Sequence, residues 1–176
     1  MLRRRSLLAS LAAFAFAAAT APSSFAVAPR HASNLFVILR SKNADEAHYD
    51  ARLTRDGALD SNDPVDGYFM NLDPQGKWYR EDFTWFQKRA YGWDTSSTGN
   101  GTYALKLKAF NDRPMWIVKA NGRWRVQTTV AGKQAYLDHL YVATDESGIM
   151  PKVLYVDIFG EDAASGAALT EHLRNK

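Results

Sequence analysis

The stretch from residue 102 to residue 130 constrains the fold of this chain most, because its pattern sets its own strand pairing. Residues 103–110 alternate between two sets, Tyr103, Leu105, Leu107 and Ala109 on one face and Ala104, Lys106, Lys108 and Phe110 on the other, which is typical of a strand with one buried face. Two further runs, 115–120 and 123–130, follow a predicted turn at 111–114 and are separated by Asn121-Gly122. The spacing predicts three consecutive antiparallel strands.

Two hairpin registers fit the last two of these runs. A two-residue turn at Asn121-Gly122 pairs Ala120 with Arg123. A three-residue loop shifts the pairing by one residue and places Trp116 opposite Val126. Because a one-residue shift exchanges the two faces, we predict the register that unites these apolar residues, which is the three-residue loop.

Short apolar runs separated by Asp, Asn, Pro and Gly continue along the rest of the chain. We predict strands at residues 34–40, 47–53, 65–72, 93–95, 135–144 and 153–160, and a last strand or short helix at 167–173. A helix is predicted over residues 85–91, since Thr84 and Gln87 have capping-box spacing, and Phe86 and Ala90 should pack on the sheet.

The fold class that follows is mainly β. About eight short strands and one helix predict an antiparallel β-barrel-like or sandwich domain, and the pattern leaves barrel and sandwich open. We find neither an internal repeat nor a linker, so residues 27–176 should form a single domain, with residues 27–33 as a loose leader.

Residues 1–26 have the pattern of a signal peptide. Three arginines at 3–5 precede an apolar run at 7–19, and Ser24-Phe25-Ala26 predicts cleavage before Val27. Residues 4–8 (RRSLL) resemble a twin-arginine export signal, although an ordinary secretory signal fits as well. We therefore expect a periplasmic or secreted protein without a transmembrane segment after signal removal.

The charge of the chain argues against a nucleic-acid partner. The sequence has 22 basic residues and 19 acidic ones, so removal of the three signal arginines leaves 19 of each. A balanced charge of this kind does not attract phosphate backbones or anionic membranes. The sequence contains no cysteine, which excludes disulfides and thiol chemistry.

Several short segments resemble the bacterial domain-of-unknown-function family 4833. They are ILRSKN at 38–43, YD at 49–50, DPV at 63–65, RAYG at 89–92 and YVDIFG at 155–160. The resemblance covers the chain from about residue 34 to its end, with Tyr68-Phe69 where the family pattern has a tryptophan after Val65. It implies an exported domain without an assigned activity, and it supplies no catalytic residue.

Two groups of polar residues could carry chemistry. His48 and Asp50 lie two apart on one strand face, as an oriented general base or two metal ligands would. We favour the simpler interpretation, the exposed polar face of an edge strand. Asp157 lies in an apolar strand, where a carboxylate needs a cation or several donors, and Arg40 is the partner that we expect.

Other candidates are weaker. Tyr91, Trp93 and Trp116 could line a ligand site near a barrel mouth, although aromatic residues more often form core. Asp138 and His139 are adjacent in a strand and should face opposite sides, which excludes a local pair. The acidic loop at 56–66 lacks the spacing of a calcium loop, so we predict no metal and no cofactor.

Three functions remain open at this point. We favour a non-enzymatic domain that binds a small apolar ligand or an envelope protein through residues among Arg40, His48, Asp50, Tyr91, Trp93, Trp116 and Asp157. The second is a hydrolase or metal-dependent enzyme that uses His48, Asp50 or Asp157, which would have to converge on one cleft. The third is a structural or interaction module with a filled core and exposed aromatic residues.

Overall fold

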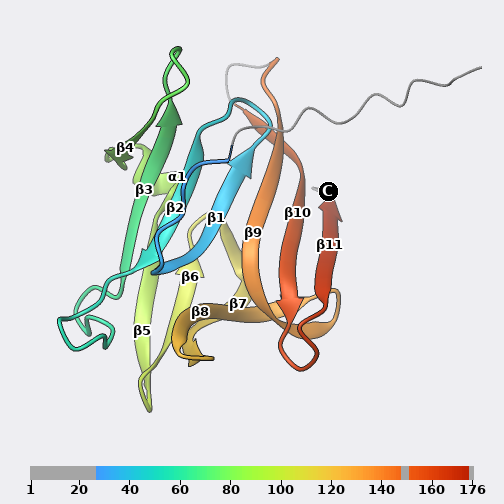
Figure 1. Cartoon of the computed structure of the whole chain (residues 1–176). Helices are drawn as coiled ribbons and strands as arrows, with labels where there is room; N and C mark the ends of the chain where they lie inside the picture. The colour runs from blue at the N-terminus through green and yellow to red at the C-terminus, as the bar shows by residue number, and fades with distance from the viewer. Residues whose placement is uncertain (1–26, 148–150, 175–176) are drawn as a thin grey trace, which may run out of the picture.

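The computed structural model describes residues 27–147 and 151–174, and the predicted signal peptide lies outside them (Figure 1). The described residues form eleven strands of one sheet and one short helix. The elements are β1 (Asn34–Arg40), β2 (Glu46–Ala51), β3 (Val65–Leu72), β4 (Trp78–Asp82), α1 (Gln87–Tyr91), β5 (Trp93–Gly99), β6 (Thr102–Leu107), β7 (Phe110–Ala120), β8 (Arg123–Val130), β9 (Lys133–Asp145), β10 (Lys152–Asp162) and β11 (Ala168–Arg174). The mainly β prediction is confirmed, but the strands number eleven and their sheet does not close on itself.

Strand β9 joins two halves of the sheet. One half runs β4-β3-β2-β1-β9 and the other runs β5-β6-β7-β8-β9, while β10 and β11 continue from the opposite edge of β9 (Figure 1). The first residues of β9 pair with β8, and residues 139–142 pair in parallel with β1. A bulge lies between these two regions, because Asp138 is the extra residue opposite Phe159 and Gly160.

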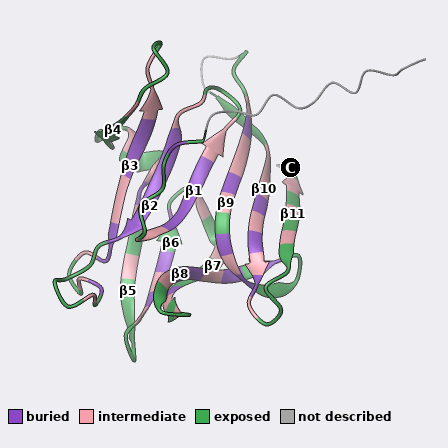
Figure 2. Cartoon of the chain, in the orientation of Figure 1, coloured by how far each residue is buried: buried purple, intermediate pink, exposed green. Residues whose placement is uncertain are grey.

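The apolar core lies between the two halves. It includes the fully buried Phe36 and Tyr49 from β1 and β2, Ile117 from β7, and Leu140 and Ile158 from β9 and β10. Figure 2 shows that burial is most complete on β2, where every residue is buried. The predicted alternation on β6 is confirmed, since every second side chain of that strand is buried.

The predicted hairpin register between β7 and β8 is wrong. Ala120 pairs with Arg123 across a two-residue turn, and both turn residues are left-handed, with φ of 51° at Asn121 and 78° at Gly122. This turn matches the right-handed twist of the strands, which outweighs the apolar pairing that we predicted. Ile117 therefore lies opposite Val126 in the core, and Trp116 is 38% exposed on the other face.

A Gly122→Ala substitution tests this turn. Alanine at a φ of 78° is strained, so we expect the free energy of unfolding to fall by about 1 kcal/mol or more. Chemical denaturation measures the change, and Gly122→Asn is the matched control, because asparagine tolerates a positive φ better than alanine does. An unchanged midpoint for Gly122→Ala would contradict the left-handed turn.

Of the predictions for the helix and the turn that follows β6, one is confirmed and two are wrong. The capping box is confirmed, because the Thr84 amide donates to Gln87 Oε1 at 2.7 Å and the Gln87 amide donates to Thr84 Oγ1 at 3.3 Å. The expected packing face is wrong, since Phe86 is 65% exposed and no residue of α1 is buried. The predicted turn at 111–114 is also wrong, because the chain turns at Lys108-Ala109 and residues 111–114 belong to β7.

Candidate functional site

Strand β2 carries a row of buried polar side chains. Glu46, His48 and Asp50 are at most 5% exposed, although they face away from the core residues Ala47 and Tyr49. The predicted exposed face of an edge strand is wrong, because β2 pairs with both β1 and β3. Residues 28–33 contribute to the burial of this face, because Ala28 packs with Tyr68 and Met70 and the His31 ring meets Tyr68 edge to face at 6.3 Å.

We call residues 28–33 the N-terminal segment. The Ala28 amide donates to Glu46 Oε1 at 2.9 Å, and Ala28 itself is 2% exposed. The Ser33 carbonyl accepts from the Ala51 amide at 2.8 Å. The expected loose leader is therefore a docked segment, tied to β2 at both of its ends.

The polar row divides into two hydrogen-bond networks. His48 Nε2 lies 2.9 Å from Glu46 Oε2, and His48 Nδ1 is buried without a hydrogen-bond partner. Asp50 accepts from the Tyr68 hydroxyl and from Asn34 Nδ2, each at 2.8 Å. Burial and the bond to Asp50 raise the pKa of Tyr68. Asp50 therefore does not orient His48, because its oxygens are bound to other donors.

Asp157 lies elsewhere on the sheet. Its carboxylate is 2.6 Å from His172 Nδ1 on β11, so the expected partner Arg40 is wrong. Arg40 instead pairs with Asp45 at 3.3 Å and lies over the Phe69 ring at 4.8 Å. Strands β1 and β9 lie between β2 and β10, which places Asp157 about 14 Å from the row on β2.

The three candidate aromatic residues do not form one site. Tyr91 and Trp93 pack against the core, where Trp93 meets Tyr49 edge to face at 5.7 Å and Tyr91 meets Phe69 at 5.1 Å. Trp116 is exposed on the outer face of β7. Two of the three thus pack onto the core and add to its aromatic contacts.

The bulge in β9 creates a pair that the sequence argument excluded. Asp138 Oδ2 and His139 Nδ1 are 2.7 Å apart, since the extra residue removes the strict alternation of side chains. His139 stacks on Phe159 with ring centroids 4.2 Å apart. The bond from His139, together with Arg30, lowers the pKa of Asp138 to about 2.

The lowered pKa of Asp138 predicts a pH dependence of stability. An aspartate in the unfolded chain has a pKa of about 3.9. The stabilisation by the Asp138 carboxylate is therefore present above that pH and is lost as the pH falls toward 2. We expect Asp138→Asn to reduce the loss of stability in this range. Urea denaturation of both proteins at pH 5, 4 and 3 would measure it, and parallel curves would contradict the assignment.

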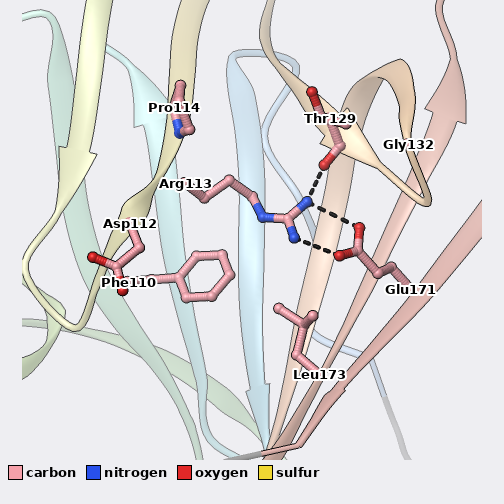
Figure 3. A pocket seen from close by; sticks show the side chains of 8 residues that line it. All are labelled: Phe110, Asp112, Arg113, Pro114, Thr129, Gly132, Glu171 and Leu173. Atoms are coloured by element: carbon pink, nitrogen blue, oxygen red, sulfur yellow. Dashed lines mark hydrogen bonds and ion pairs between the residues drawn. The ribbon is translucent and has the colours of Figure 1, made fainter.

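A cleft between β7 and β11 was missed by the sequence argument (Figure 3). Its volume is about 380 Å³, and it is lined by Phe110, Asp112, Arg113, Pro114, Thr129, Gly132, Glu171 and Leu173. Proline has no N–H to donate to a ladder, and the pairing of β7 with β8 begins only at Trp116, after Pro114. Arg113 and Pro114 thus lie outside the backbone ladder of β7 and β8, and both line the cleft.

An ion pair crosses the cleft. The Arg113 guanidinium donates to both Glu171 oxygens, at 2.6 and 3.0 Å, and to the Thr129 carbonyl (Figure 3). Glu171 also accepts from the Ala131 amide at 2.7 Å. These donors lower the pKa of Glu171, so the pair stays charged and ties β7 to β11.

The comparisons with known proteins agree with the resemblance of the short segments. The model of a family described as "Domain of unknown function (DUF4833)" matches residues 36–172. The chain belongs to this family. Comparison with curated proteins and with solved structures gave no match. The matched residues of this DUF4833 chain run from β1 to β11 and begin after the N-terminal segment.

Two features of the DUF4833 chain concern metals and membranes. In residues 27–147 and 151–174, no three His, Asp or Glu side chains group as metal ligands would. Two carboxylates of the loop at 56–66 instead meet arginines, with Asp63 2.8 Å from Arg52 and Asp66 3.1 Å from Arg80. No helix among the described residues is long and apolar enough to cross a membrane.

Proposed function

We propose that this chain is an exported, non-enzymatic binding domain whose small ligand lies in the cleft between β7 and β11. The observation that carries the proposal is the cleft itself. Its volume of about 380 Å³ is within the range of roughly 300–1,000 Å³ for small-molecule sites. The apolar side chains of Phe110, Pro114 and Leu173 line it together with a single ion pair.

The lining favours an apolar or amphipathic ligand. The Arg113–Glu171 pair is neutral as a unit, and both Glu171 oxygens accept from Arg113, one of them also from the Ala131 amide. Phe110 and Leu173 offer apolar contact area, which drives the binding of small ligands. A polar group on the ligand would meet Asp112 at the rim.

The positions of the polar candidates support binding rather than hydrolysis. A hydrolytic site needs its acid, base and nucleophile around one reacting atom. His48 and Asp50 lie beneath the N-terminal segment, and Asp157 is about 14 Å away and bonded to His172. The enzyme alternative therefore lacks a shared cleft for these three residues.

We also propose that the domain functions in the periplasm or outside the cell. The support is the pattern of residues 1–26, which fits both an ordinary secretory signal and a twin-arginine signal. Replacement of Arg4 and Arg5 by lysine distinguishes the two, because the twin-arginine route requires the arginine pair. Export that survives the double substitution would point to the ordinary route.

Native mass spectrometry of the protein purified from its own cell envelope tests the ligand proposal. We expect a bound organic mass on the native protein. Leu173→Trp should abolish it by filling the cleft, whereas Thr170→Trp, on the exposed face of the same strand, should keep it. The mass of the protein alone, or a ligand that stays bound to the Leu173→Trp variant, would overturn the assignment. A bare mass would direct attention to the exposed Trp85 and Phe86 as a surface for a protein partner.

A further inference from the structure

A second pocket lies at the start of β8, and the N-terminal segment forms part of its wall. Its volume is about 180 Å³. It is lined by Arg30, His31, Ala32, Asn34, Leu35, Arg123, Arg125, Leu137 and Asp138. Three arginines from two places in the sequence, the N-terminal segment and β8, therefore line one small cavity, which shares no lining residue with the β7–β11 cleft.

Each of the three arginines is held differently. Arg125 is 8% exposed, lies over the Tyr136 ring at 4.2 Å and donates through Nη2 to Glu161 at 2.7 Å. Arg30 donates through Nη1 to Asp138 at 2.8 Å. Within the described residues, Arg123 forms no ion pair. The pocket thus combines the buried guanidinium of Arg125, which is held in place, with those of Arg30 and Arg123, whose side chains can change conformation.

Hydrogen-bond donors remain for a ligand after these contacts. A guanidinium carries five N–H donors, and Arg30 and Arg125 each direct one nitrogen at a carboxylate. Among the described side chains, only Arg40 Nε and His48 Nδ1 are buried without a partner. The other guanidinium nitrogens of Arg125 are therefore accessible. Because Arg125 lines the pocket, these nitrogens can donate to a ligand there.

The charge around the pocket is positive. Three arginines face two carboxylates, Asp138 and Glu161, and the second of these lies outside the lining. The hydrogen bond from Arg125 and the charge of Arg123 lower the pKa of Glu161, and Arg30 contributes to the low pKa of Asp138. Both carboxylates are thus ionised at neutral pH, and one unit of positive charge remains uncompensated.

We propose that this pocket binds a small oxyanion, the phosphate or carboxylate group of a low-molecular-mass solute. Guanidinium groups bind these groups through paired, charge-assisted hydrogen bonds. The volume of about 180 Å³ suits a compact anion. The anion replaces pocket water and contacts Arg30, Arg123 and Arg125 together.

Binding of the anion stabilises the N-terminal segment. Arg30, His31 and Ala32 belong to this segment, whereas Arg123 and Arg125 belong to β8. An anion that contacts both groups links the segment to the sheet, in addition to the bond between Ala28 and Glu46. The occupied pocket should therefore slow hydrogen exchange of the amides of residues 30–32.

Isothermal titration calorimetry with inorganic phosphate and with citrate tests the proposal, at constant ionic strength in sodium chloride. We expect saturable binding to the full exported protein, and the stronger of the two anions identifies the phosphate or carboxylate preference. Arg123→Glu should weaken it roughly tenfold or more, since a charged hydrogen bond is lost and repulsion is added. Lys77→Glu makes the same charge change in the exposed β3–β4 turn and should bind as the native protein does.

Arg123 is exposed, so its substitution should leave the fold intact, and the thermal midpoint without anion checks this. Absence of saturable binding to both anions would overturn the proposal. So would equal weakening by Arg123→Glu and Lys77→Glu, because that result would indicate a general charge effect. Unchanged exchange of residues 30–32 on saturation would contradict the contact with the N-terminal segment.

Discussion

Replacement of Tyr49 by alanine is expected to lower the free energy of unfolding by about 3–5 kcal/mol. The Tyr49 ring is fully buried between the two halves of the sheet. It stacks on Phe36 at 4.4 Å, meets Trp93 edge to face at 5.7 Å, and donates its hydroxyl to the Tyr91 carbonyl at 2.7 Å. Since a typical domain has a stability of about 5–15 kcal/mol, a loss of this size leaves it marginal.

Urea denaturation followed by tryptophan fluorescence measures the change. The matched control is Tyr49→Phe, which keeps the ring and removes only the hydroxyl that binds the Tyr91 carbonyl. It should cost about 1 kcal/mol, the usual net value of one hydrogen bond. Equal losses in the two variants would contradict the conclusion that ring packing dominates at this position.

Replacement of Glu46 by alanine is expected to have a comparable effect by a different mechanism. Glu46 accepts from the Ala28 amide and lies 2.9 Å from His48 Nε2, and all three residues are buried. Removal of the Glu46 carboxylate leaves two buried groups, the Ala28 amide and His48 Nε2, without their partner, at a cost of about 1–3 kcal/mol each. The N-terminal segment should also detach from β2.

Two measurements separate these effects. Chemical denaturation reports the global stability, and hydrogen exchange at the Ala28 amide reports detachment of the segment. The control Glu46→Gln retains a carbonyl that can accept from Ala28, so it should keep more of the protection at that amide. Native-like protection of Ala28 in Glu46→Ala would show that other contacts hold the segment.

Local pattern was sufficient to predict the central strands. Residues 34–40 and 65–72 have the predicted bounds of β1 and β3, because long apolar runs bounded by turn residues have few other interpretations. The capping box likewise depends on two residues three apart. Strand β4 was missed, since Arg80, Glu81 and Asp82 give it the composition of a surface loop.

The remaining differences come from contacts between distant residues. Burial of His48 and Asp50 depends on the N-terminal segment, and no pattern within β2 could reveal what covers its second face. The partner of Asp157 is His172, which the pairing of β10 with β11 selects. The β7–β11 cleft had one local signal, Pro114 inside a strand, which we interpreted as a turn.

The dual pairing of β9 has a consequence for how the chain reaches its native state. Val37 of β1 pairs with His139, about 100 residues later in the sequence, so this contact has a high contact order and should form late. Hairpins β2–β3 and β7–β8 can form early from local sequence. Before β9 pairs with them, β1 and β8 each have an unpaired edge to which other chains can pair and aggregate. We therefore expect the domain to be protected from misassembly only once its entire chain has folded.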